Sequence, residues 1–203
     1  MLNTKDGQLD AILTKNYAQD IINLFFKNRT IEIVEDKERQ LKGVDIVLGN
    51  KINIDIKWHR YQSPLNENGK PITTSSWMIF ELGQYVKDVI GKRRIDETKT
   101  WTRPGQLTDY ILWVDIWNSR AYLISEKAIQ ETAAKIKKGL AYGTTFPTTA
   151  DGEGHSFAFK MIKIGERIPA EFERPIPKRL AESLRITAKV KPQQNIYAKD
   201  TAK

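Results

Sequence analysis

Two short runs in which apolar and polar residues alternate, 44–48 and 52–57, predict a pair of strands folded back on each other. Gly49-Asn50 between them is typical of a turn. A loop of two residues would set apolar positions opposite polar ones, because a slip of one position turns every side chain to the other face. A three-residue loop, 49–51, avoids this mixing. The pairs it predicts are Leu48 with Ile52, Ile46 with Ile54, and Val44 with Ile56.

The same register places Asp45 directly across from Asp55, with Lys57 on the same polar face. Directly opposed residues have Cβ atoms about 4.5 to 5.5 Å apart, so two like charges there repel each other. A cation between the carboxylates removes the repulsion, and a hard, oxygen-seeking ion such as Mg²⁺ is the usual candidate. The hairpin therefore predicts a metal site held by carboxylates.

The chain has Val44-Asp45 and then, on the next predicted strand, Asp55-Ile56-Lys57. This pattern resembles the PD-(D/E)XK nuclease superfamily, which has the restriction-endonuclease-like fold. Val44 stands where that family usually has a proline. The resemblance implies an α/β (α+β) fold, in which a restriction-endonuclease-like core has a central mixed β-sheet flanked by helices. It also implies a metal-dependent nuclease that hydrolyses phosphodiester bonds, most often in DNA.

The resemblance further implies a role for each residue of the motif. Asp45 is the main ligand of Mg²⁺ (or Mn²⁺), Asp55 is a second, and the carbonyl of Ile56 is a third. Lys57 orients the attacking water or stabilises the charge on the phosphate. Asp20 is a further catalytic candidate, because members of this family often carry an acidic residue on the first helix. The other acidic residues that could complete the cluster are Glu32, Glu35 and Glu81.

The remaining elements are predicted from apolar spacing and from turn residues. Helices are expected over 8–28, 126–140 and 177–184, and further strands over 30–36, 76–82, 110–117, 121–124 and 157–164. Polar loops are expected over 59–74 and 141–156. The predicted elements begin with one helix followed by three strands, which is the order that opens the restriction-endonuclease-like core. Asp115, within an apolar strand, is interpreted as a buried polar residue with its hydrogen bonds satisfied.

Composition favours a polyanionic partner. The formal net charge is +8, and neutralisation of phosphates by Lys and Arg is the main source of affinity for nucleic acid. We expect DNA rather than RNA. The residues expected to contact it follow Lys57 or lie in the basic stretch 83–102, and they are His59, Arg60, Tyr61, Lys92, Arg93 and Arg94.

Other features exclude several classes of site. The chain has no cysteine and two histidines, so disulfides and thiolate zinc sites are excluded and any metal must be held by carboxylates.

No apolar run approaches the length of a membrane span, and no signal peptide is recognisable, so we expect a cytoplasmic protein without membrane contact. One nuclease-like domain is expected over 1–186, with a basic, disordered tail over 187–203. A homodimer would suit cleavage of both strands.

Three alternatives stay open at this stage. The first is a nucleic-acid-binding protein of the same fold without catalytic activity. The second is a nucleotidyltransferase, although such enzymes usually have two acids on one strand, where this chain has Asp55 and Lys57. The third is a plain hairpin in which these two residues form a surface ion pair. The choice between endonuclease and exonuclease also stays open.

Overall fold

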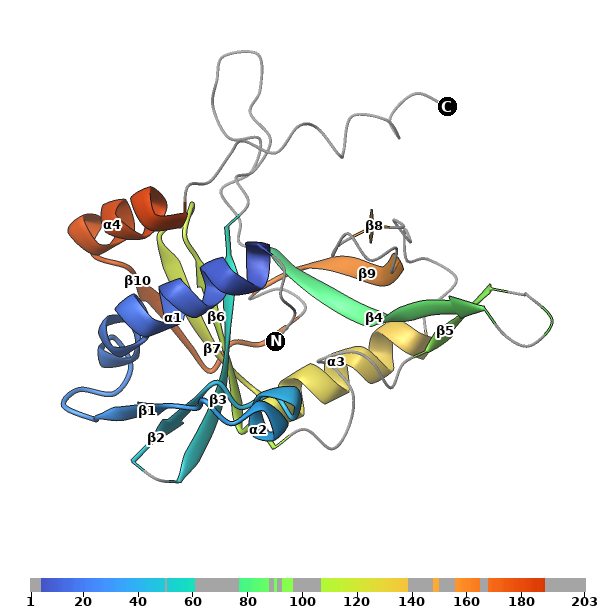
Figure 1. The fold of residues 1–203 in the computed structure, drawn as a ribbon, viewed down its shortest axis with the longest axis horizontal. Helices are drawn as coiled ribbons and strands as arrows, with labels where there is room; N and C mark the ends of the chain where they lie inside the picture. Colours follow the sequence, from blue (N-terminus) through green and yellow to red (C-terminus); the bar gives the residue numbers. More distant parts are fainter. Residues whose placement is uncertain are drawn as a thin grey trace, which may run out of the picture.

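The computed structural model describes residues 5–49, 51–60, 77–87, 90, 93–96, 107–138, 148–149, 156–164 and 168–188. The protein is an α+β fold with two sheets (Figure 1). Its helices are α1 (Lys5–Asn23), α2 (Lys37–Leu41), α3 (Glu126–Lys138) and α4 (Lys178–Ala188). Its strands are β1 (Ile31–Ile33), β2 (Ile46–Leu48), β3 (Ile52–His59), β4 (Trp77–Lys87), β5 (Arg93–Asp96), β6 (Tyr110–Asp115), β7 (Arg120–Ser125), β8 (Thr148–Thr149), β9 (Ser156–Lys163) and β10 (Phe172–Pro175).

The larger sheet has six strands in the order β1-β2-β3-β6-β7-β10. All neighbouring strands are antiparallel except β3 and β6, which are parallel. The smaller sheet has the order β5-β4-β9-β8. The larger sheet is thus mixed, as the sequence predicts, and helices flank it on both sides.

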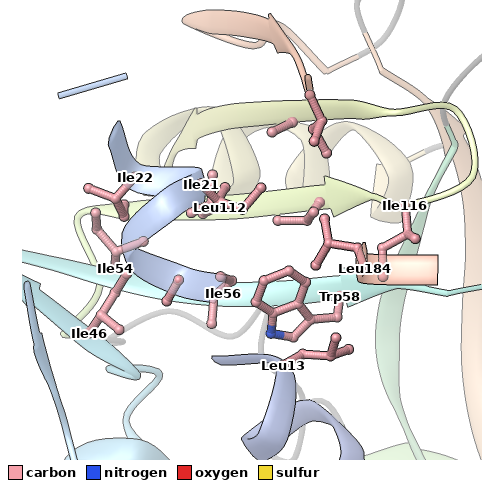
Figure 2. Packing of buried hydrophobic residues seen from close by; sticks show 14 of the residues in the cluster. Leu13, Ile21, Ile22, Ile46, Ile54, Ile56, Trp58, Leu112, Ile116 and Leu184 are labelled. Carbon is pink, nitrogen blue, oxygen red and sulfur yellow. The ribbon is translucent and has the colours of Figure 1, made fainter. Parts of the chain in front are cut away.

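One face of the larger sheet packs against α1 and α4. Ile54, Ile56 and Trp58 alternate along β3 and are buried in the same cluster as Leu13 of α1 and Leu184 of α4 (Figure 2). The indole Nε1 of Trp58 donates a hydrogen bond of 2.9 Å to the hydroxyl of Thr14 in α1. This face is the main core, because burial of large apolar side chains is the chief stabilising contribution in folding.

The other face of the sheet packs against α3. Ile111 and Trp113 of β6 and Ile124 of β7 are buried there with Ile129 of α3. Because side chains alternate between the faces of a strand, the odd-numbered residues of β3 also belong to this side. Those residues are Asn53, Asp55, Lys57 and His59.

The predicted hairpin is confirmed over most of its length. Leu48 pairs with Ile52 and Ile46 with Ile54, so the loop has three residues. Gly49 begins this loop at φ +58°, a left-handed conformation that glycine adopts without strain. The predicted pairing of Val44 with Ile56 is wrong.

The hairpin departs from its predicted pairing at Asp45. There the backbone N–H donates to the carbonyl of Ile54 at 3.1 Å. Val44 then packs with Val34 and Val47 instead. The cause is a local change in backbone hydrogen bonding, which an alternating pattern does not predict.

The helices differ from those predicted. The first helix spans Lys5–Asn23 rather than 8–28. A short helix, α2, occupies the predicted polar connection, because the carboxylate of Asp36 accepts the N–H of Arg39 at 2.8 Å and caps it. The last helix spans Lys178–Ala188 rather than 177–184.

The sequence did not predict strands β5, β8 and β10, and β8 lies within the expected loop 141–156. Strand β10 pairs with β7 at the edge of the larger sheet, and its residues are all exposed. An exposed edge strand carries no apolar alternation for the sequence to reveal. Among the described residues, no helix combines the length and the apolar character that crossing a bilayer requires.

Candidate active site

Asp55 and Lys57 form an ion pair on the α3 side of β3. The side chain of Asp55 is 3% exposed, and the Nζ of Lys57 lies 2.8 Å from its Oδ1. The side chain of Lys57 is 31% exposed, so the ammonium group contacts both the buried carboxylate and solvent. The pair is therefore not the plain surface ion pair of the third alternative.

Asp45 joins this pair from the end of β2. Its Oδ2 accepts the backbone N–H of Ile56 at 3.1 Å, and its backbone carbonyl accepts the N–H of Val34 at 2.8 Å. These two bonds hold Asp45 against β3, where its carboxyl group is close enough to that of Asp55 to raise the pKa of Asp55. The structure thus brings Asp45, Asp55 and Lys57 together.

The two carboxyl groups oppose each other electrostatically. Burial raises the pKa of Asp55 well above its ordinary value, Lys57 lowers it, and the charge and hydrogen bond of Asp45 raise it further. A buried carboxylate beside another carboxylate is stable only when a proton or a cation neutralises one charge. Lys57 supplies part of that neutralisation.

A divalent cation would fit this arrangement. Mg²⁺ is commonly held by one or two protein carboxylates and keeps several waters. Asp45 and Asp55 meet that requirement. In the part of the chain that the structure describes, no cluster of three or more His, Cys, Asp or Glu side chains is placed to hold a metal. Ile56 lies between the two acids with its side chain in the core, and the role of its carbonyl stays a prediction.

The structure does not bring Asp20 to this site. Asp20 is an exposed residue of α1, and α1 covers the face of the sheet opposite to Asp55. Glu32 and Glu35 are also exposed, and Glu32 lies 4.0 Å from Arg39. The side chain of Glu81 lies outside the described part of the chain.

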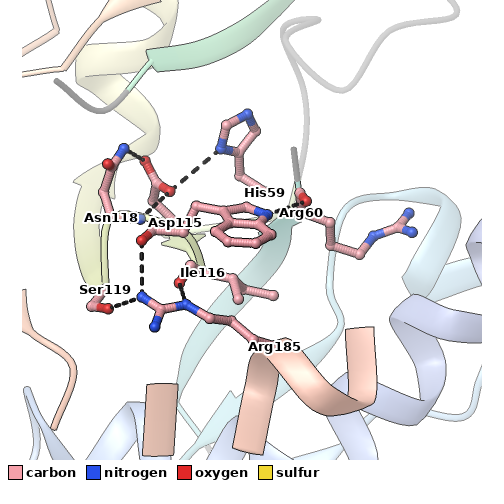
Figure 3. Close-up of polar contacts among 8 residues, drawn as sticks. His59, Arg60, Asp115, Ile116, Asn118, Ser119 and Arg185 are labelled. Carbon is pink, nitrogen blue, oxygen red and sulfur yellow. Dashed lines mark hydrogen bonds and ion pairs between the residues drawn. The ribbon is translucent and has the colours of Figure 1, made fainter. Parts of the chain in front are cut away.

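His59 lies two residues beyond Lys57 and faces the same side of the sheet. Its Nδ1 is 3.6 Å from Oδ1 of Asp115, an ion-pair distance slightly longer than a hydrogen bond (Figure 3). Its ring stacks on Trp113, with ring centroids 5.3 Å apart and planes inclined by 25°. Sequence reasoning missed the contact between His59 and Asp115, which depends on the parallel register of β3 and β6.

Asp115 is completely buried and its hydrogen bonds are satisfied, as predicted. It accepts the backbone N–H of Asn118 at 3.1 Å and the side-chain amide of Asn118 at 2.9 Å. Burial alone would raise the pKa of Asp115, but His59 and Asn118 together hold it below its ordinary value. Asp115 is therefore an ionised carboxylate beneath the histidine.

Arg60 does not face the site. Its Nε lies 3.1 Å from Oδ1 of Asp10 in α1, and its side chain is 12% exposed. Its backbone carbonyl accepts the indole N–H of Trp117 at 2.9 Å (Figure 3). This pairing argues against the predicted phosphate contact. Tyr61 and Lys92 lie outside the described residues, and Arg93 and Arg94 belong to β5, whose side chains are also outside the description.

Comparison of the chain with models of known protein families, with curated proteins and with solved structures found no match.

Proposed function

We propose that the protein is a metal-dependent nuclease with a restriction-endonuclease-like core. The observation that supports this most is the meeting of Asp45, Asp55 and Lys57 on one side of the sheet. Their proximity follows from the contacts of β2 and β3, independently of the motif that suggested them. Asp55 is buried beside a second carboxyl group, and a bound cation would neutralise the negative charge that Lys57 balances only in part.

Each residue of the cluster has a role in this proposal. Asp45 and Asp55 hold Mg²⁺, with Mn²⁺ as a substitute, which when bound polarises the phosphate and lowers the pKa of an attached water. Lys57 is held by Asp55 at 2.8 Å and remains partly exposed. Its ammonium group can therefore contact a phosphate oxygen or the attacking water while Asp55 keeps it in position.

A nucleic acid is the proposed substrate, and DNA is favoured. The net charge of +8 supports a polyanion, because Lys and Arg side chains release counterions when they neutralise phosphates. The nucleic-acid-binding protein without activity is the alternative, and cleavage assays separate the two.

The test compares cleavage by wild type, Asp55→Asn and Lys57→Ala on single-stranded, duplex and branched DNA and RNA. Wild type should cleave at least one substrate with Mg²⁺ or Mn²⁺ and none with EDTA. Each variant should lose about 100-fold or more in rate, the range found when one charged group that stabilises a transition state is removed. Lys51→Ala is the matched control, because Lys51 is an exposed lysine in the turn of the same hairpin, and it should cleave normally.

Cleavage that persists in EDTA, or that survives in both variants, would refute the proposal. Binding without cleavage by wild type under all these conditions would instead support the inactive nucleic-acid-binding protein.

A further inference from the structure

Asp55, Lys57 and His59 form a row on one face of β3. Residues two apart on a strand are about 6.6 Å apart along it, so Lys57 has Asp55 on one side and His59 on the other. A phosphate that contacts Lys57 would have the acid pair at one end and the imidazole at the other. Displacement at phosphorus requires such an arrangement, because the attacking and leaving oxygens lie on opposite sides of the phosphorus atom.

Asp115 and Trp113 fix the orientation of His59. The Nδ1 of His59 faces the buried carboxylate at 3.6 Å, and Figure 3 shows the second ring nitrogen pointing away from Asp115. A carboxylate at Nδ1 holds the N–H on that atom, so Nε2 is the ring nitrogen left to contact a substrate. The stacking on Trp113 restricts rotation of the ring.

A purely structural role does not explain this contact. Asp115 already accepts two hydrogen bonds from Asn118, which hold the turn between β6 and β7. Arg185 of α4 adds a hydrogen bond of 2.9 Å to the carbonyl of Trp117 and one of 2.6 Å to Ser119 in the same turn. The turn is thus stabilised without His59.

We propose that His59, positioned by Asp115, is a catalytic residue that protonates the leaving oxygen of the phosphodiester. This inference rests on the proposed nuclease function. The water oxygen forms a bond to phosphorus while the bond from phosphorus to the leaving nucleoside oxygen breaks. That oxygen takes a proton from Nε2 of the imidazolium form of His59, which leaves the neutral ring with its proton on Nδ1, and the proton released by the attacking water returns to Nε2 through solvent.

The test compares two DNA substrates that differ only at the scissile bond. One is an ordinary phosphodiester, and the other carries sulfur in place of the leaving oxygen. Sulfur leaves readily as a thiolate and needs no proton. His59→Gln should therefore lose about 100-fold or more on the ordinary substrate, the typical contribution of general acid catalysis, and less than about 5-fold on the sulfur substrate.

Asp115→Asn should show the same selective loss, smaller in size, because Asp115 acts through His59 and does not touch the substrate. Ser119→Ala is the control for damage to the β6–β7 turn, and any loss should be equal on both substrates. The ratio of the two rates within one protein preparation is insensitive to partial unfolding.

Three results would overturn the inference, and they are distinguishable. Equal losses on both substrates in His59→Gln, or no loss on either, would exclude proton donation while the nuclease function stands. Failure of wild type to cleave either substrate, with metal present, would overturn the nuclease function and this inference together.

Discussion

Asp55 is buried beside one positive and one negative side chain, and burial, aided by the negative neighbour, makes its charge unfavourable. The structure has Lys57 at 2.8 Å and the carboxyl group of Asp45 in contact. Burial and Asp45 together outweigh Lys57, since the pKa of Asp55 is raised well above its ordinary value. In the absence of metal, the charged form of this side chain is therefore less favourable in the folded protein than in the unfolded chain.

Asp55→Asn should therefore raise the free energy of unfolding in EDTA, because an amide resembles the neutral carboxyl group without its charge. A carboxyl whose pKa is raised in the folded state contributes most to stability below its unfolded pKa, and that contribution is lost as pH rises through the folded pKa. The advantage of the variant should thus be large at pH 8 and shrink as the pH falls. Urea unfolding of both proteins across this range measures it.

Metal should reverse the order of the two proteins. Under the proposed function, Mg²⁺ should bind the folded wild type and stabilise it by about 2.7 kcal/mol at a concentration 100 times its Kd, whereas Asp55→Asn would lack one of the proposed ligands. Equal stabilisation of both by Mg²⁺ would show that the ion binds elsewhere. A variant less stable than wild type in EDTA at every pH would contradict the electrostatic account.

At the scale of elements, α4 is held to the rest of the protein by one apolar side and one arginine. Ala181 and Leu184 are buried in the main core. The guanidinium of Arg185 donates to the carbonyl of Ile116 at 3.2 Å and lies 5.7 Å from the ring of Trp117. On the outer side of the helix, Ile186 is 76% exposed.

Leu184→Ala should lower the free energy of unfolding by about 2 to 5 kcal/mol, since it removes buried methyl groups and leaves a cavity. Ile186→Ala, two residues away in the same helix, should change it by less than about 0.5 kcal/mol. Both variants shorten a branched aliphatic side chain to alanine, so helix propensity does not separate them. Similar losses in urea unfolding would mean that α4 does not pack as described.

How far the sequence predicts these elements depends on whether an element buries one face. The β2–β3 hairpin does, so alternation alone predicts its register correctly at Ile46 and Leu48. Strand β10 lies at the edge of the sheet with every residue exposed, and only its backbone pairs with β7. Nothing in its side chains marks it as a strand.

The residues of the candidate site also differ in how far the sequence predicts their positions. Asp45, Asp55 and Lys57 come together through a tight hairpin, and their proximity can be derived from a short stretch of sequence. His59 and Asp115 lie on strands that are distant in the sequence and meet through the parallel pairing of β3 with β6. Apolar periodicity predicts each strand but not which strand lies beside which. Asp20 was predicted from a family pattern, and the structure places it across the sheet.

At the scale of the whole molecule, the pairing of β3 with β6 has a consequence for the order in which the protein folds. Strands β1, β2 and β3 are close in sequence and antiparallel. Pairing β3 with β6 requires closure of the long chain segment between His59 and Tyr110. Closing a long loop costs entropy before its contacts form.

We therefore expect the acid pair to assemble early during refolding and the contact between His59 and Asp115 to assemble late. Pulsed amide exchange should protect the N–H of Ile56, which Asp45 accepts, before that of Ile116, which the carbonyl of His59 accepts. Simultaneous protection would contradict this order. Under the proposed function, a newly made chain would then acquire its affinity for metal before it acquires its proposed proton donor, and an incompletely folded molecule would hold the ion without cutting nucleic acid efficiently.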